Sequence, residues 1–271
     1  MLKKIKALRL DVEALFSQVV YGHGYLHYGY WPTGHAGEVT LQRLGIAQRA
    51  YFDRLCEAIP AGTKSILDVG SGTGSNALGL SEKGYAVDCV CPSPKLNAMA
   101  RQKLPAASRI FESKFEELDI PERYDLVLFC ESFHYLDARL ALRRLERYAL
   151  KHVLIFDYFP RKDSQDDKRV SRAQFGALME QEISKDFAVL WDLDVTQYIV
   201  PTFEVLDGIK NQFVQPFCVR LIHELKQEHP VMARMLAFPM RKALAKLEKR
   251  SNRHETFPAQ NEYRLLLLAR K

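Results

Sequence analysis

Three glycines separated by single residues are the first group in this chain that could do chemistry. Gly70, Gly72 and Gly74 follow the apolar run Ile66–Val69 and precede a helical stretch. Glycine adopts positive φ and lets a ligand lie against the backbone, and free N–H groups at a helix N-terminus bind polar or acidic groups. A dinucleotide-binding turn usually has its third glycine one residue later, where this chain has Ser75. The spacing therefore favours another kind of nucleoside-binding turn.

A second group follows a later apolar run, Tyr124–Cys130, which we interpret as a strand. The next residues include Glu131, His134 and Tyr135. Open α/β sheets bind ligands beyond the carboxyl ends of their strands. Because histidine titrates near neutrality, His134 is the candidate for a general base or for a group that orients a substrate. Glu131 is expected to lie near a cofactor.

A third group is the segment Tyr21–Pro32, which is rich in aromatic residues and glycine. It precedes the glycine turn and is separated from it by a predicted helix at 38–58 that ends before Pro60. Aromatic faces attract cations, so such a segment is suited to close over a positively charged ligand.

Alternating strands and helices must position these groups. This alternation predicts an α/β fold with a parallel, doubly wound sheet. Helices are expected at Asn76–Lys83, Pro94–Leu104 and Ala138–Tyr148. Strands are expected at Ser65–Val69, Ala86–Cys91, Arg109–Phe111, Tyr124–Cys130, Lys151–Tyr158, Ala188–Val200 and Glu262–Ala269.

The string Ile66-Leu-Asp-Val-Gly-Ser-Gly-Thr-Gly-Ser75 resembles motif I of class I S-adenosylmethionine (SAM)-dependent methyltransferases. Leu26-His-Tyr-Gly-Tyr-Trp31 resembles the LHxGYW segment of their small-molecule branch. That branch includes sugar and natural-product O-methyltransferases and, more distantly, cyclopropane synthases and prenyl-diphosphate C-methyltransferases. Asn261–Lys271 resembles the family's last, antiparallel strand. The resemblance covers most of residues 15–160 and that last strand.

This resemblance implies a Rossmann-like seven-stranded methyltransferase sheet, mostly parallel with the last strand antiparallel, together with a helical N-terminal cap and a helical lid. It implies SAM as the cofactor and no metal. The expected catalytic residues are Glu131 and His134. The expected substrate-binding residues are Tyr21, His27, Tyr28, His134 and Tyr135. The expected cofactor-binding residues are Tyr30, Trp31, Asp68, Gly70, Ser71, Gly72, Gly74, Cys91, Pro92, Lys114, Phe115 and Glu131.

Two positions depart from the family pattern. Many members end the second strand with an acid that binds the ribose hydroxyls, whereas this chain has Cys91 there. Asp88 is three residues too early and on the opposite face of a strand. Lys114 occupies the position of an acid that accepts from the adenine amine, which leaves the backbone N–H of Phe115 to meet the adenine ring.

Four parts are expected along the chain. Residues 1–60 would form the cap with its aromatic loop, 61–200 the SAM-binding core, 201–260 the lid, and 261–271 the final core strand. The stretch Phe203–Arg250 is too long for a loop, and its Phe and Met residues suit helices that contact a lipophilic molecule. The basic residues of 241–250 are expected on a helix.

Composition limits the kinds of partner and the cellular compartment that we expect for this protein. No stretch is long and apolar enough to span a membrane, and the formal charge of +6 allows peripheral membrane contact or an anionic substrate. The five cysteines form no CxxC pair, which indicates reduced thiols and a cytoplasmic protein.

The expected function is methyl transfer from SAM to a small lipophilic acceptor, with the oxygen of a hydroxyl or carboxylate as the acceptor atom. Three alternatives stay open: a C-methyltransferase of a lipid or prenyl chain, an RNA methyltransferase, and a non-catalytic protein with the same fold. No nucleic acid is expected, because the chain lacks both the Asn/Asp-Pro-Pro-Tyr/Phe string of base-amine methylation and a visible RNA-binding module.

Overall fold

A single mixed sheet organises the protein, for which a computed structural model describes residues 24–32, 40–162, 170–229 and 250–271. The strand order is β3-β2-β1-β4-β5-β7-β6. β1, β2, β3, β4 and β5 pair in parallel, and β7 pairs antiparallel with both β5 and β6. The bounds are β1 Ser65–Val69, β2 Ala86–Val90, β3 Ile110–Phe111, β4 Tyr124–Cys130, β5 Ala149–Pro160, β6 Phe187–Asp194 and β7 Asn261–Arg270. The expected methyltransferase topology is confirmed.

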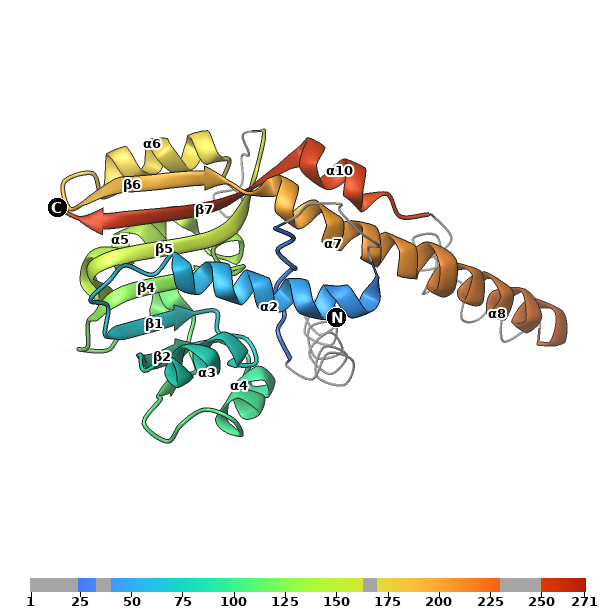
Figure 1. Cartoon of the computed structure of the whole chain (residues 1–271), viewed down its shortest axis with the longest axis horizontal. Coiled ribbons are helices and arrows are strands. Elements are labelled where there is room, and N and C mark those ends of the chain that lie inside the picture. The colour runs from blue at the N-terminus through green and yellow to red at the C-terminus, as the bar shows by residue number, and fades with distance from the viewer. Residues whose placement is uncertain (1–23, 33–39, 163–169, 230–249) are drawn as a thin grey trace.

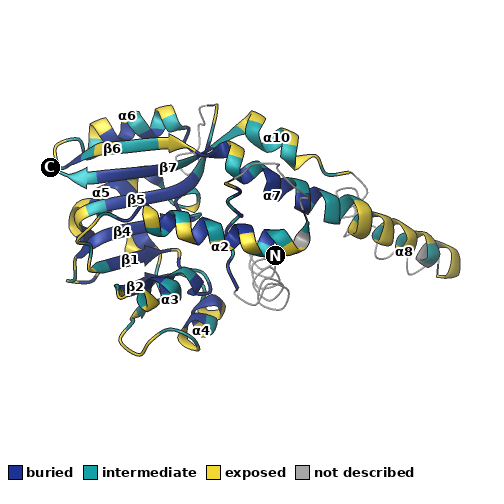
Figure 2. Cartoon of the chain, viewed as in Figure 1, coloured by how far each residue is buried: buried dark blue, intermediate teal, exposed yellow. Residues whose placement is uncertain are grey.

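Alternating apolar side chains on the central strands divide the core between the two faces of the sheet. Leu67, Val127 and Ile155 pack with α5 (Ala138–Tyr148) and α6 (Arg172–Glu182). On the other face, alternate residues of the same strands pack with α2 (Leu41–Glu57), α3 (Ser75–Glu82) and α7 (Thr196–Ile209). Figure 2 shows the resulting buried layer along the sheet.

Local sequence explains where most of these helices begin. Asp137 accepts a hydrogen bond from Leu140 N–H at the start of α5, and Ser171 forms a capping box with Gln174 at the start of α6. Ser93 caps α4 (Pro94–Arg101), where proline occupies the first turn without losing a helical hydrogen bond.

Most strands lie where they are expected, and β1, β4 and α5 match in both bounds. The predicted strand Ala188–Val200 is wrong in its second half, because β6 ends at Asp194 and α7 begins at Thr196. Asp194 Oδ1 accepts from both the N–H and the hydroxyl of Thr196, at 2.9 and 2.5 Å, which turns the chain into the helix. Helix α6 has no counterpart among the expected elements.

A long helical rod extends from the sheet in Figure 1. It consists of α7, the π-helical turn η3 (Lys210–Val214) and α8 (Gln215–Glu228). α10 (Arg253–Gln260) lies beside α7 and leads into β7. The predicted domain boundary at residue 200 falls within α7, and the basic segment 241–249 lies outside the described residues.

No helix in the described ranges is long and apolar enough to cross a membrane.

Candidate cofactor and acceptor site

The glycine turn connects β1 directly to α3, as its spacing predicts. Gly70, Gly72 and Gly74 have φ of 77°, 55° and 75°, a region that residues with a Cβ rarely adopt. A Cβ on Gly70 would lie 2.3 Å from Ser132 Cβ, and one on Gly72 would lie 3.1 Å from Leu26 Cδ1. The turn therefore brings bare backbone to the carboxyl edge of the sheet.

Asp68, in the strand before the turn, is the electrostatically unusual residue of this edge. Its side chain is buried, and Oδ2 has no hydrogen-bond partner among the described residues. Burial raises the pKa of Asp68 from 3.8 to about 7, because a carboxylate loses its hydration there. An orphaned buried carboxylate fits a cationic group of a ligand, such as the amino group of SAM.

Residues 24–28 of the aromatic segment cross this turn. Gly24 O accepts a hydrogen bond of 2.7 Å from Thr73 Oγ1. Leu26 packs with Cys91 beside the turn, and Tyr28 N–H donates to Glu131 Oε1 at 2.7 Å. The segment thus joins motif I to the loop after β4, although the two are far apart in sequence.

The end of the aromatic segment is held by α2 and α7. Thr202 Oγ1 accepts from Gly29 N–H at 3.0 Å and from Trp31 Nε1–H at 2.9 Å. The Trp31 ring packs in a buried cluster with residues of α2 and α7. The Tyr30 ring lies 5.0 Å from that of Tyr198 in α7. Tyr30 and Trp31 therefore contact these two helices, and Tyr21 lies outside the described residues.

Two further residues of the segment face different surroundings. His27 is buried, with its ring stacked 4.1 Å from that of Tyr51 in α2. The Tyr28 ring belongs to a set of neighbouring rings that we call the aromatic cluster. Its members come from five parts of the chain: Tyr28, Tyr158, Phe203, Phe257 and Tyr263.

His134 has a partner that the sequence analysis missed. Asp157, fully buried in β5, accepts from His134 N–H at 3.2 Å and lies 2.8 Å from His134 Nδ1. The imidazole contacts the rings of Tyr135 and Tyr158, with centroids 3.9 and 4.4 Å away. The sequence did offer one signal for this pairing. Asp157 lies near the end of a predicted strand, and adjacent parallel strands end at the same edge of a sheet.

Glu131 joins three segments of the chain. Its Oε1 accepts from Tyr28 N–H at 2.7 Å and from the Tyr263 hydroxyl at 2.6 Å. Its φ of 50° is the one positive value among described residues other than glycine, and such strain persists where surrounding contacts fix it. Through these contacts Glu131 positions the aromatic segment.

The second strand ends without an acid at the expected ribose position. Cys91 is buried, and its sulfur accepts from the N–H groups of Gly72 and Ser93. Burial raises the pKa of the Cys91 thiol, which therefore stays neutral. Pro92 is exposed. Asp88 is held elsewhere, by Arg109 and Tyr124.

The two positions expected to meet the adenine ring, Lys114 and Phe115, also differ from the family pattern. Lys114 is exposed and pairs with Glu117. The Phe115 side chain is buried against Phe129 and Tyr148, so its ring belongs to the core. Among the described residues, no group of three or more His, Cys, Asp or Glu side chains is arranged to hold a metal ion.

Comparisons with known proteins agree with this fold. Residues 67–155 match the methyltransferase domain family. The fold and the matched domain are those of methyltransferases. An uncharacterized methyltransferase of Bacillus cytotoxicus is 28% identical over 101 residues, which is 37% of this chain and 48% of that protein. A putative methyltransferase of a Geobacillus species is 38% identical over 79 residues, 28% of this chain and 32% of that protein. The chain thus spans less than half the length of these relatives.

Solved structures match over nearly the whole chain. The O-methyltransferase domain of StiE aligns with a TM-score of 0.64 at 19% identity, covering 91% of this chain and 87% of its own. The [4+2]-cyclase SpnF gives 0.66 at 17%, with 95% and 93% covered. Geranyl diphosphate C-methyltransferase from Streptomyces coelicolor, in complex with S-adenosylhomocysteine (SAH), gives 0.64 at 14%, with 96% and 92% covered. At these identities the likeness shows the fold.

Proposed function

We propose that this protein transfers the methyl group of SAM to a hydroxyl oxygen of a small lipophilic acceptor, with His134 as the general base. The observation that carries the proposal is the His134–Asp157 pair, which lies at the carboxyl edge of the sheet and beside the aromatic cluster.

SAM fits the residues present. Among the described residues the Asp68 Oδ2 atom has no hydrogen-bond partner, and Gly70 and Gly72 present bare backbone beside it. Leu26 and Cys91 add an apolar surface next to the turn. When bound, SAM supplies a methyl group on a sulfonium, which needs no further activation. The protein's contribution is to hold the acceptor in line and to exclude water.

His134, held by Asp157, can accept the proton of the acceptor hydroxyl group. With Asp157 accepting from Nδ1–H, the Nε2 lone pair of His134 is available to a hydroxyl group. Nε2 would accept the hydroxyl proton while the acceptor oxygen receives the methyl group that bound SAM would supply, leaving SAH. The resulting imidazolium is stabilised by the buried Asp157 carboxylate.

The aromatic cluster supports a lipophilic acceptor. Tyr158 and Phe257 are partly exposed, and their centroids lie 5.5 Å apart next to His134. Tyr135, whose ring also contacts the imidazole, is 63% exposed. In this proposal residues 24–31 close over SAM and acceptor, with Glu131 holding Tyr28 in place.

Label transfer tests this function. Purified protein is incubated with methyl-labelled SAM and organic-solvent extracts of cells, and labelled products are identified by mass spectrometry. His134→Gln and Asp157→Asn should lower the rate of labelling by about 10²-fold or more and keep SAH affinity, while the matched control His152→Gln, in β5, keeps both. Equal labelling by His134→Gln and wild type would contradict the base assignment.

C-methylation is a second candidate, favoured by the aromatic rings themselves. Methyl transfer to an alkene creates a carbocation, which the faces of Tyr158, Phe203 and Phe257 could stabilise. Nuclear magnetic resonance of the product separates the candidates, because a methoxy group and a C-methyl group have distinct shifts.

A further inference from the structure

We propose that Arg253 binds an anionic group of the acceptor, so that the substrate is a lipophilic hydroxy acid methylated on its hydroxyl rather than on its acid. This inference rests on the proposed function and names its substrate class.

Arg253 is the first residue of α10 and leans over the aromatic cluster. Its guanidinium carbon lies 4.7 Å from the ring centroid of the buried Phe203. Its Nη2 donates to the Tyr28 hydroxyl at 3.3 Å. The ring face and the hydroxyl fix the guanidinium plane, and its remaining N–H donors match the two oxygens of a carboxylate or phosphate.

Acidic side chains near Arg253 have other partners. Asp207 accepts from the backbone N–H and lies 2.7 Å from Nδ1 of His254. Glu255 lies 3.7 Å from Nε2 of the same histidine. Within the described part of the chain, Arg253 forms no ion pair, so its charge is balanced by none of these carboxylates.

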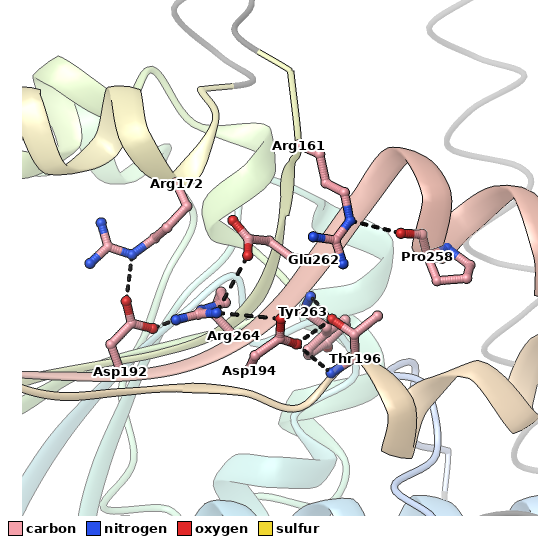
Figure 3. Close-up of polar contacts among 9 residues, drawn as sticks. All are labelled: Arg161, Arg172, Asp192, Asp194, Thr196, Pro258, Glu262, Tyr263 and Arg264. Carbon is pink, nitrogen blue, oxygen red and sulfur yellow. Dashed lines mark hydrogen bonds and ion pairs between the residues drawn. The ribbon is translucent and has the colours of Figure 1, made fainter.

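Two other arginines near the same end of the sheet, Arg172 and Arg264, are paired with carboxylates, as Figure 3 shows. Arg172 and Arg264 share Asp192, at 2.6 and 2.8 Å. Arg264 also lies 3.4 Å from Glu262. Arg161 donates to Pro258 O at 2.8 Å and so supports the end of α10. Arg253 differs from this network because it contacts rings and a hydroxyl.

The aromatic cluster separates Arg253 from His134. From Phe203 the rings continue through Phe257, at 4.3 Å, and Tyr158, at 5.5 Å, to the imidazole of His134, at 4.4 Å. An acceptor that lies along these rings places an acid at Arg253 and a second group at His134. The acid cannot then receive the methyl group, because Arg253 holds it at the opposite end of the rings from the site next to His134 where we propose methyl transfer.

Binding measurements test this arrangement. Calorimetry with saturating SAH measures the dissociation constants of decanoate and of the uncharged 1-decanol. Wild type should bind decanoate about tenfold more tightly than Arg253→Gln does, equivalent to about 1.4 kcal/mol. Decanol should bind both proteins alike. Arg253→Lys keeps the charge without the planar fork and should lie between them. The control Arg49→Gln removes an exposed arginine from α2 and should match wild type.

The possible results separate the two proposals. Equal affinity for decanoate and decanol in wild type, or an equal loss in Arg253→Gln and Arg49→Gln, would overturn the anion site and leave the methyltransferase proposal intact. Absence of SAH binding in wild type would contradict the methyltransferase proposal itself. An Arg253→Lys variant that behaves like Arg253→Gln at unchanged melting temperature would locate the recognition in the guanidinium fork.

Discussion

Asp68→Asn should stabilise the protein without ligand increasingly as the pH rises. The pKa of Asp68 is raised from 3.8 to about 7 by burial, a shift of about 3 units, which corresponds to about 4 kcal/mol. The folded state therefore holds the proton more tightly than the unfolded state does. The resulting penalty is absent below pH 3.8, grows as the pH rises toward about 7, and is complete above that value.

The comparison with asparagine isolates the free-energy penalty of ionising Asp68 in the folded protein. Asparagine keeps the shape of the side chain but does not titrate, and its buried amide costs about 1–3 kcal/mol at every pH if it stays unpaired. The difference in unfolding free energy, Asp68→Asn minus wild type, should rise by about 1.4 kcal/mol per pH unit between about pH 5 and 7 and then level off. The change between about pH 5 and 7 should be about 3 kcal/mol, which is most of the full penalty of about 4 kcal/mol.

Urea unfolding at several pH values measures this difference, and titration of SAH supplies a second measurement. The ammonium group of SAH should favour the ionised form of Asp68 and lower its pKa, so binding near pH 7 should release a fraction of a proton to the solvent. Calorimetry in two buffers of different ionisation enthalpy detects that release in wild type, and Asp68→Asn should lose it together with affinity. Asp53→Asn, at an exposed position on α2, controls for the removal of one carboxylate. A stability difference that stays constant from pH 5 to 8 would refute the reasoning.

Three further predictions address the turn, the base and the segment that covers them. Gly72→Val should abolish SAH binding in a protein that still folds, since φ of 55° and the space above the turn both require glycine; unchanged affinity by calorimetry would contradict the motif. Asp157→Asn should lower kcat by about 10²-fold or more with little change in SAH affinity, because His134 loses the acceptor that orients it; a wild-type rate would remove Asp157 from the mechanism. Thr202→Val should cost about 2 kcal/mol in urea unfolding, because Gly29 N–H and Trp31 Nε1–H lose their shared acceptor; a loss below about 0.5 kcal/mol would show that water replaces it.

Patterns local in sequence determined the framework of this protein. β1 and β4 are short apolar runs bounded by turn residues, and α5 has strong helical periodicity with Asp137 as its cap, so their bounds are readable. The glycine turn is equally local, because its positive φ values depend on the residue type at each position.

Other features depend on residues that meet only after folding. The strand predicted at 188–200 ends early because the Asp194–Thr196 hydrogen bonds favour a helix over continued β structure. The α6 helix has almost no amphipathic pattern to detect, although its N-terminus has a clear capping box. Local propensity is a weak guide where such side-chain contacts compete with it.

The same distinction between local sequence and tertiary contacts applies to the site. The sequence predicted roles for His134 and Glu131 from their place after a strand. The sheet decided that Asp157 partners His134, because β4 and β5 are adjacent and parallel. Likewise Glu131 meets Tyr28 and Tyr263 only because the N-terminal segment and β7 both reach the carboxyl edge of β4. Directed hydrogen bonds between residues distant in sequence require a fixed geometry over a few ångströms, and the tertiary structure alone supplies that geometry.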